Sequence, residues 1–212
     1  KQGKTYPKVE GGNDYFVSLK SNGELWSWGV NTYGQLGTKD RVNRLEPTKL
    51  DIYDEVQGDS VSYPIDVAAG ANHTIVLKND GTVWAVGYNN NGQLGNGTTT
   101  LSTEFVQVKL NDQEYLTDVV AVTAANNTSY ALTASGFVYG WGNNSYGQLG
   151  NGSTTTSKYA KKVSKASNIA QISAGNYNLM MLDSNGTVFA VGYNNNGQLG
   201  VNNRTTQRLP VQ

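Results

Sequence analysis

The sequence predicts an all-β protein built from four copies of one small antiparallel sheet, and three observations lead to this prediction. The tetrapeptide GQLG occurs four times, with spacings of 58, 55 and 50 residues. The longer phrase GYNNNGQLG occurs twice, at residues 87–95 and 192–200. The composition, with 25 Gly, 25 Asn and 20 Thr against four Pro, is typical of short strands joined by tight turns.

Two strands around a turn form the centre of each copy. The first strand is mostly apolar, with β-branched and aromatic residues. The turn ends in glycine in every copy (SNG, NDG, ASG and SNG), because hairpin turns need a positive φ that glycine adopts without strain. The expected first strands are residues 15–20, 73–78, 129–134 and 178–183. The expected second strands are residues 24–29, 82–87, 137–142 and 187–192.

Two flanking strands complete a four-stranded unit. The strands expected before the hairpins are residues 65–69, 119–124 and 169–174. The strands expected after GQLG are residues 47–50, 105–110, 159–163 and 209–211. One such sheet cannot bury both of its faces alone, so neighbouring sheets must stack, and a β-propeller-type array of four blades satisfies this need. We expect one repeat domain over residues 1–212, with repeats at about 6–50, 61–110, 116–165 and 168–212.

The segment 69–97, AGANHTIVLKNDGTVWAVGYNNNGQLGNG, resembles the repeat of the regulator of chromosome condensation family. All four copies match that repeat at their glycine, apolar and GQLG positions, and together they span nearly the whole chain. The resemblance implies a β-propeller whose members act by docking proteins, among them a small-GTPase exchange factor that also binds chromatin and bacterial β-lactamase inhibitors. The contact loops of those proteins have no recognisable match here, so no site residue is carried over.

Ring closure is a separate question, since members of this family usually close seven blades and this chain carries four copies. Three arrangements remain open: a fragment of a longer propeller, a small four-bladed ring, and an open array completed by another copy. We favour the fragment, because both ends stop where one blade gives way to the next. The chain begins with Lys1 rather than Met, so we also expect that an upstream segment was removed.

The four copies alternate in sequence. Copies one and three share a WSWG or YGWG strand and an NTYG or NSYG loop, whereas copies two and four share WAVGYNNNG or FAVGYNNNG. This order, A, B, A, B, predicts duplication of a two-blade unit. It further predicts an even number of blades if the parent chain kept growing in the same way.

The chemistry-bearing residues argue against an enzyme. The chain has no Cys and a single His, His73, whose counterparts in the other copies are Tyr15, Thr128 and Asn178. This content excludes the common transition-metal sites and the Ser–His or Cys–His nucleophiles. We therefore expect no catalytic residue, no metal and no cofactor. The 16 basic and 16 acidic residues cancel, which argues against a nucleic-acid partner. No apolar run reaches the ~20 residues needed for membrane insertion.

Aromatic residues fall into two groups. Trp26, Trp84, Tyr139 and Phe189 share one strand register, so we expect them in the core between blades. Other tyrosines lie in loops beside Asn, Ser and Gly, a composition typical of recognition surfaces or of simple packing over turns. Acidic residues gather in two spacers, 51–59 and 112–118, which suit solvated loops or, as the alternative, loops that bind calcium or a partner. The predicted partner-binding residues are Tyr33, Tyr88, Tyr146, Tyr193, Asn89, Asn194, Tyr53, Asp54 and Tyr115.

The leading prediction is a non-enzymatic protein–protein interaction module that binds a protein partner through these loops. The alternative is a glycan-binding cell-surface adhesin, and a small-GTPase nucleotide exchange factor is third. A lightly charged, Asn- and Thr-rich chain without Cys suits an extracellular or cell-surface protein of bacterial origin. Open blade edges would allow self-association, and we expect the lysines at 158, 161, 162 and 165 to protect one such edge against strand addition.

Overall fold

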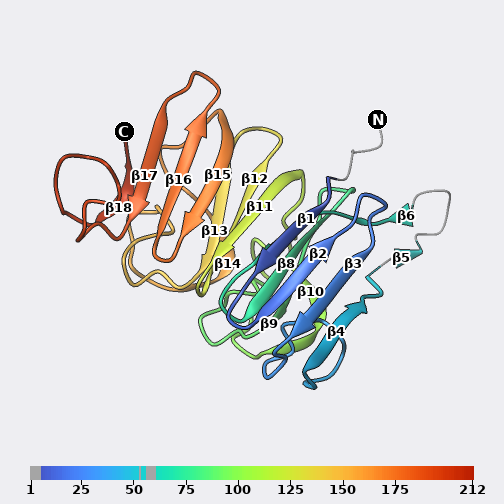
Figure 1. Ribbon diagram of the computed structural model, residues 1–212. Helices are drawn as coiled ribbons and strands as arrows, with labels where there is room; N and C mark the ends of the chain where they lie inside the picture. The colour runs from blue at the N-terminus through green and yellow to red at the C-terminus, as the bar shows by residue number, and fades with distance from the viewer. Residues whose placement is uncertain (1–5, 53, 56–60) are drawn as a thin grey trace.

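The computed structural model describes residues 6–52, 54–55 and 61–212, and it shows an all-β molecule (Figure 1). Within those residues there is no helix. The strands form four antiparallel four-stranded sheets, here called blades 1 to 4. The predicted fold class is therefore confirmed.

In every blade the strands lie side by side in chain order. Blade 1 contains β1 (Lys8–Gly11), β2 (Tyr15–Leu19), β3 (Leu25–Gly29) and β4 (Arg44–Lys49). Blade 2 contains β7 (Pro64–Ala69), β8 (His73–Lys78), β9 (Val83–Gly87) and β10 (Ser102–Gln107). Blade 3 contains β11 (Val119–Ala125), β12 (Thr128–Thr133), β13 (Val138–Gly142) and β14 (Ser157–Lys162). Blade 4 contains β15 (Ile169–Gly175), β16 (Asn178–Asp183), β17 (Val188–Gly192) and β18 (Gln207–Val211). A small hairpin of β5 (Asp54–Glu55) and β6 (Val61–Ser62) joins blades 1 and 2.

The hairpin strands begin and end within one residue of the expected bounds, but the outer strands differ. Each outer strand begins two or three residues earlier than expected, and all of them pair with the neighbouring strand through a register shift. Such a shift interrupts the regular alternation of side chains along a strand, so the sequence pattern does not mark where these strands begin. Blade 1 also has its own innermost strand, β1, in a segment that the sequence pattern marked only as a junction between blades.

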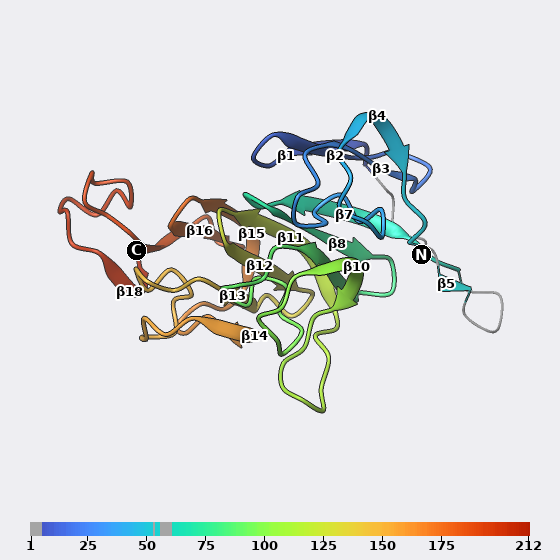
Figure 2. The same ribbon diagram turned by 90° about the horizontal axis from the view of Figure 1, so that it is seen from below.

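The blades pack face to face in chain order around a common axis, and we call this open arrangement the fan. The innermost strands β1, β7, β11 and β15 contact their neighbours in that order, and Figure 2 shows blade 1 and blade 4 at the two ends of the fan. Backbone hydrogen bonds join the inner turns in series, from Asn13 N to Ala71 O (2.8 Å) and from Ala71 N to Asn126 O (2.7 Å). The ring is not closed, so a complete four-bladed ring is the one expected arrangement that the structure contradicts.

Three apolar cores lie between the blades, one at each of the three junctions. Blades 1 and 2 enclose Tyr15, Val17, Leu19, Leu25, Leu36, Leu50, Ile52, Val67, Ala69 and Val76. Blades 2 and 3 enclose Ala68, Ile75, Leu77, Val83, Ala85, Leu94, Val108, Leu116, Val119, Val122, Ala131, Trp141 and Ala160. Blades 3 and 4 enclose Tyr130, Leu132, Val138, Leu149, Val163, Ala166, Ile169, Leu179, Met181 and Val191. Burial of sheet faces against one another is thus the force that holds the blades together.

The prediction that Trp26, Trp84, Tyr139 and Phe189 lie in the core is wrong by one position along the strand. Trp26 and its three counterparts are only half-buried, whereas the residues just before them in blades 1 to 3 are fully buried. A one-residue step along a strand moves a side chain to the opposite face of the sheet. The Lys20 ammonium lies 4.0 Å from the centre of the Trp26 ring, and the Lys78 ammonium lies 4.6 Å from that of Trp84. These two indole rings therefore lie beside the cores, and each has a lysine ammonium packed against it.

Candidate functional site

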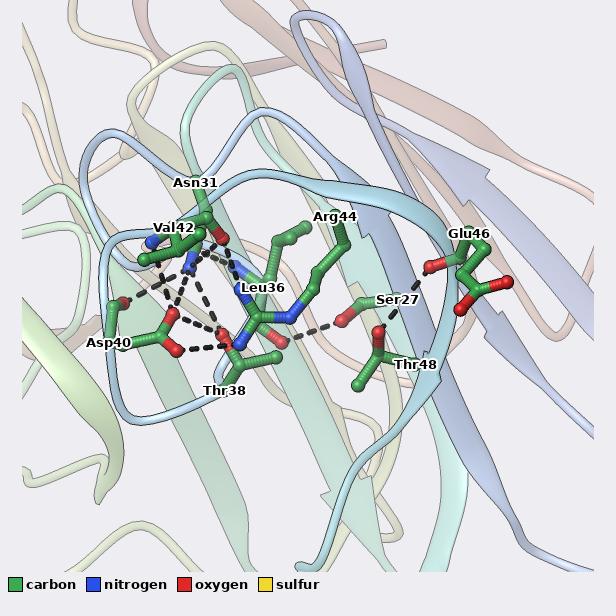
Figure 3. A network of polar contacts seen from close by, with 9 residues as sticks. All are labelled: Ser27, Asn31, Leu36, Thr38, Asp40, Val42, Arg44, Glu46 and Thr48. Carbon is green, nitrogen blue, oxygen red and sulfur yellow. Dashed lines mark hydrogen bonds and ion pairs between the residues drawn. The ribbon is translucent and has the colours of Figure 1, made fainter.

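The loop between the third and fourth strands of each blade is held by one buried asparagine. In blade 1 the Asn31 side-chain amide donates to the carbonyls of Asp40 (3.1 Å) and Val42 (3.2 Å), and its oxygen accepts from Leu36 N at 3.0 Å (Figure 3). Arg44 Nη2 lies 2.6 Å from Asp40 Oδ2, and this hydrogen bond lowers the pKa of Asp40 to about 2. The loop is thereby tied to the start of β4.

The same bonding pattern recurs in the other three blades. In each, the asparagine donates to the carbonyls nine and eleven residues later and accepts from the leucine N–H five residues later, with donor–acceptor distances of 2.9 to 3.1 Å. All four asparagines have no exposed surface: Asn31, Asn89, Asn144 and Asn194. Asn89 and Asn194 were expected to face a partner, but here they use their amide groups within their own loops. These two asparagines hold the loops in shape, but they are not part of the protein surface.

Five tyrosines gather at the loop ends of the blades, and we call them the tyrosine face. Tyr33 of blade 1 and Tyr88 of blade 2 have ring centres 4.7 Å apart. Tyr146 of blade 3 and Tyr193 of blade 4 repeat this pairing at the same 4.7 Å. Tyr177 joins the second pair, with its ring centre 5.1 Å from that of Tyr146. Four residues that were singled out from the sequence are thus brought together in two clusters.

Exposure distinguishes the two clusters. Tyr146 is 38% exposed and Tyr177 is 36% exposed, whereas Tyr33, Tyr88 and Tyr193 are half-buried against their neighbours. Tyr177 was missed from the sequence. Its signal was available, since it occupies the inner turn position where the other copies carry Asp14, Asn72 and Asn127. Only blade 4 therefore has an aromatic ring at this position.

The junction between blades 2 and 3 carries a different contact at the same place. There the two tyrosines are replaced by Asn91 and Asn143, and Asn143 Nδ2 donates to Asn91 Oδ1 at 3.2 Å. An A blade followed by a B blade therefore meets through two tyrosines, and a B blade followed by an A blade meets through two asparagines. This contact interrupts the tyrosine face, so its two clusters lie on either side of the central junction.

The acidic spacers lie at the opposite end of the strands. In blade 2, Ser102 pairs with Gly87 next to Tyr88, and Gln107 pairs with Trp84 at the other end of β9. The second spacer follows Gln107, so Tyr115 lies far from the tyrosine face. Tyr115 is 47% exposed, with the Lys109 ammonium 5.3 Å from its ring centre.

The first spacer also follows an outer strand. Its residue Asp54 lies in β5, and Tyr53 lies outside the described residues. The predicted partner-binding residues therefore do not form one surface, because the spacers and the loops leave opposite ends of the blades.

The buried histidine serves as a link between blades 2 and 3. His73 Nε2 lies 2.8 Å from Ser129 Oγ, and the Ser129 hydroxyl donates to Gln93 O at 2.9 Å. The proton of the Ser129 hydroxyl is used in the bond to Gln93 O. The imidazole must therefore donate to Ser129 through Nε2, which leaves Nδ1 unprotonated. Burial lowers the pKa of His73 to about 3. The ring is neutral near pH 7 and has no exposed surface, so it offers no proton to a substrate.

The inner turns surround a hollow of about 410 Å³ near the axis of the fan, lined by residues from all four blades. Small residues and backbone groups make up most of this lining. Its described residues include no nucleophile paired with a base. Across the described ranges, no three Asp, Glu or His side chains come together as ligands for a metal ion. The same ranges contain no helix that is long and apolar enough to cross a bilayer.

Comparison with known proteins gives several relatives that are much longer than this chain. The human X-linked retinitis pigmentosa GTPase regulator is 33% identical over 147 residues, which are 66% of this chain and 13% of that protein. The mouse E3 ubiquitin-protein ligase HERC2 is 34% identical over 157 residues, 73% of this chain and 3% of that protein. The ultraviolet-B receptor UVR8 of Arabidopsis thaliana is 33% identical over 146 residues, 68% of this chain and 31% of that protein. These relatives are eukaryotic and give no support to a bacterial source.

Solved structures show the same arrangement of blades. Human WBSCR16 matches with a TM-score of 0.76 and 23% identity, over 94% of this chain and 49% of that chain. Prp20p of Saccharomyces cerevisiae matches with a TM-score of 0.77 and 20% identity, over 98% of this chain and 50% of that chain. The model of the RCC1-like domain family matches residues 2–212. This confirms the resemblance drawn from the repeats: the chain belongs to the RCC1-like domain family.

Proposed function

We propose that this chain is a non-enzymatic protein-binding module whose tyrosine face contacts the partner. The observation that carries the proposal is the exposed pair Tyr146 and Tyr177, whose rings pack against each other in a T-shaped arrangement above loops with fully buried frameworks. Tyrosine supplies a large amphipathic contact area with few rotatable bonds, and it is enriched among residues that dominate binding energy. Membership of a family of regulators supports the general role of an interaction scaffold.

The rigidity of the loops also favours binding. Binding costs free energy for every side chain and loop that it orders, and a preorganised surface avoids much of this cost. Each loop is closed by the asparagine bonds, and each GQLG glutamine accepts a hydrogen bond from the N–H two residues before it at 2.9 Å. The tyrosines therefore stand on a framework that is already formed before the partner arrives.

A proteomic capture with matched variants tests the proposal. The chain, the double variant Tyr146→Ala/Tyr177→Ala, and the control Tyr115→Ala at the opposite end are immobilised and exposed to the same lysate. We expect a protein captured by the unaltered chain and by the control to be lost from the double variant, with an affinity at least tenfold lower in a direct titration. Equal capture by all three proteins would overturn the proposed surface, provided that circular dichroism shows all three folded.

A second candidate, regulation of a small GTPase, is favoured by what is stated of the comparison proteins. One relative is a GTPase regulator, and yeast Prp20p has binding properties toward Gsp1p and histones. The chain covers 13% of the first protein and half of the second, so this activity is a separate proposal. Accelerated release of a fluorescent nucleotide from a small GTPase on adding the chain would support it. An unchanged release rate at saturating chain concentration would exclude it.

A glycan partner is the alternative that the exposed tyrosines would also suit, since their rings can stack on sugars. A glycan array separates it from protein docking. Saturable sugar binding that Tyr146→Ala/Tyr177→Ala loses would favour the glycan. An array without binding, together with one captured protein that the double variant loses, would favour protein docking.

A further inference from the structure

The net charge of zero conceals an uneven distribution of charge between the blades. Residues 1–118 contain 10 basic and 15 acidic side chains, which gives this part of the chain a formal charge of −5. Residues 119–212 contain 6 basic side chains and a single acidic one, Asp183, which gives a formal charge of +5. Blades 1 and 2 are therefore acidic, whereas blades 3 and 4 are basic. Such an asymmetry attracts an anionic partner to one side of the molecule.

Four of the six basic residues of blades 3 and 4 lie close together at the outer strand of blade 3. They are Lys158, Lys161, Lys162 and Lys165. The first three belong to β14, and the fourth follows in the connection to blade 4. The corresponding connections after blades 1 and 2 are the acidic spacers, but residues 158–168 contain no acidic side chain. The blade 3 connection therefore has the opposite charge from the other two.

Lys162 has a direct counterpart in blade 1. Lys162 pairs with Tyr139 across the strands of blade 3, and Lys49 pairs with Trp26 at the same position of blade 1. The Lys49 ammonium lies 2.6 Å from Glu24 Oε1, and the hydrogen bond between them is the main reason why the pKa of Glu24 is lowered to about 2. Blade 1 thus supplies its own anion for this lysine.

Blade 3 has no anion of its own at this place. The counterpart of Glu24 in its hairpin is Phe137, and the Lys162 ammonium lies 3.1 Å from the centre of the Phe137 ring. The face of an aromatic ring attracts an ammonium but leaves its positive charge in place. Across the described residues, neither Lys162 nor Lys165 forms an ion pair. Both charges are therefore available to an anion from another molecule.

A hollow of about 380 Å³ lies beside these two lysines. Its lining consists of Phe137 and residues 162–167, so it includes the hydroxyl groups of Ser164 and Ser167 as well as the two ammonium groups. No acidic side chain takes part in this lining. The hollow lies at the end of blade 3 opposite to the tyrosine face, because Lys162 and Ser157 pair with opposite ends of β13.

We propose that this hollow binds a phosphorylated serine or threonine side chain of a protein partner. A phosphate ester carries a charge of about −1.5 to −2 and three strong acceptor oxygens near pH 7. The two ammonium groups balance this charge, and the hydroxyls of Ser164 and Ser167 can donate to its oxygens. Val163 and Ala166 of the same segment are buried in the core between blades 3 and 4, so the segment is held in place before binding. The site goes beyond the tyrosine face and does not depend on it.

A nucleic acid suits these observations less well. Its backbone is bound through many phosphate contacts along a continuous track of basic side chains. The other two basic residues, Arg204 and Arg208, belong to blade 4, and Arg208 packs against Gly147 beside Tyr146, at the opposite end from the hollow. The Phe137 ring has a lysine ammonium on its face and so does not present that face to a base. A single phosphate group on a peptide is therefore the better match.

An NMR titration of the isotope-labelled chain tests the site directly. The probe is N-acetyl-phosphoserine amide, and N-acetyl-serine amide is the matched control. We expect saturable shifts of the amide signals of residues 162–167 with the phosphorylated probe and none with the control. The absence of saturable shifts, or shifts confined to other residues, would overturn the proposal. Equal affinity for N-acetyl-glutamate amide or for inorganic phosphate would overturn the assignment to a phosphorylated side chain.

Two double variants with the same loss of charge separate the hollow from the general field of blade 3. Lys162→Gln/Lys165→Gln should weaken binding of the probe at least tenfold, because it removes both ammonium groups from the hollow. Lys158→Gln/Lys161→Gln removes two charges of β14 that lie outside the lining, beside the Tyr159 ring, and should change the affinity less than twofold. Equal weakening by both variants would mean that no specific site exists.

A substitution taken from blade 1 gives an independent test. Phe137→Glu introduces the carboxylate that blade 1 has at Glu24, so it should pair with Lys162 and abolish binding of the probe. Phe137→Thr introduces the residue of blades 2 and 4, Thr82 and Thr187, and should retain binding. Circular dichroism confirms that both variants are folded. Retained binding by Phe137→Glu would contradict the role of Lys162. Binding of a short DNA duplex that both lysine double variants weaken equally would indicate a nucleic-acid partner and overturn the proposal.

Discussion

Blades 2 and 4 carry the same nine-residue loop, yet one lies inside the array and the other lies at its end. Within each loop the bonds are the same, from the buried asparagine to the carbonyls nine and eleven residues later. The burial of the two loops differs, because Gln93 is fully buried and Gln198 is exposed. The comparison shows that a blade forms its own loop geometry, whereas burial depends on the next blade. Matched substitutions in the two blades separate these two contributions.

The largest difference is expected at the first glycine of GQLG. Gly92 and Gly197 have φ values of 74° and 77°, so Ala at either position meets the same backbone strain, about 1 kcal/mol. Only Gly92→Ala also forces a Cβ against Lys158 Cα at 2.6 Å, and such overpacking adds about 2 to 3 kcal/mol, whereas nothing lies within 4 Å of a Cβ added at Gly197. Urea unfolding of both variants should show this difference. Equal losses of stability would mean that Lys158 does not confine Gly92.

The buried asparagines should give large and equal effects. Asn89→Ala and Asn194→Ala each leave two carbonyls and one N–H of the loop without their partner, which we expect to cost about 3 kcal/mol in both blades. The two losses should agree within about 0.5 kcal/mol, because the bonds lie inside one blade. Denaturant unfolding of both variants measures them. A much smaller loss in blade 4 would show that its loop relies on a neighbour for its shape.

Core valines should again differ between the two blades. Val83→Ala removes two fully buried methyl groups and should cost about 2 kcal/mol, from lost transfer free energy and a residual cavity. Val188→Ala removes the same groups from a half-exposed site and should cost less than about 0.5 kcal/mol. Thermal or urea unfolding provides the measurement. A similar cost at both sites would show that Val188 is covered in solution.

The hairpins could be predicted from the sequence because their signals are local. A glycine that must adopt positive φ marks each turn, such as Gly81 at 78° and Gly136 at 76°, and the strands on either side follow at once. The loop framework repeats for the same reason, since one asparagine bonds only to groups of its own loop. These features need no knowledge of neighbouring blades.

Features that depend on contact with a second blade could not be predicted from local sequence signals. The sequence shows that Trp26 and Leu25 are both apolar, but only the stacking of blades decides that Leu25 faces the core. The asparagines of GYNNNGQLG look polar and available, although Asn89 is fully buried by its own loop. Likewise, the sequence indicates loop tyrosines, but the strand register places the acidic spacers at the far end of the blades.

His73 and Asn178 are the counterpart residues of blades 2 and 4, and they provide a pH-dependent comparison. Below pH 6.5 the unfolded chain protonates His73, whereas burial holds the pKa of the folded ring at about 3. The unfolded state then binds more protons, so the stability present above pH 6.5 falls as the pH falls toward 3. Protonation would occur at Nδ1, which has no hydrogen-bond partner among the described residues.

The slope of this loss should be about 1.4 kcal/mol per pH unit, or about 2 kcal/mol between pH 6.5 and 5. His73→Asn places the blade 4 residue in blade 2 and removes the titrating group, so the variant should lose stability at pH 7 but show a flatter dependence on pH. Urea unfolding of both proteins from pH 7 to pH 4.5 gives the two slopes. Parallel slopes would mean that carboxylates, rather than the histidine between blades 2 and 3, control the acid sensitivity of the array.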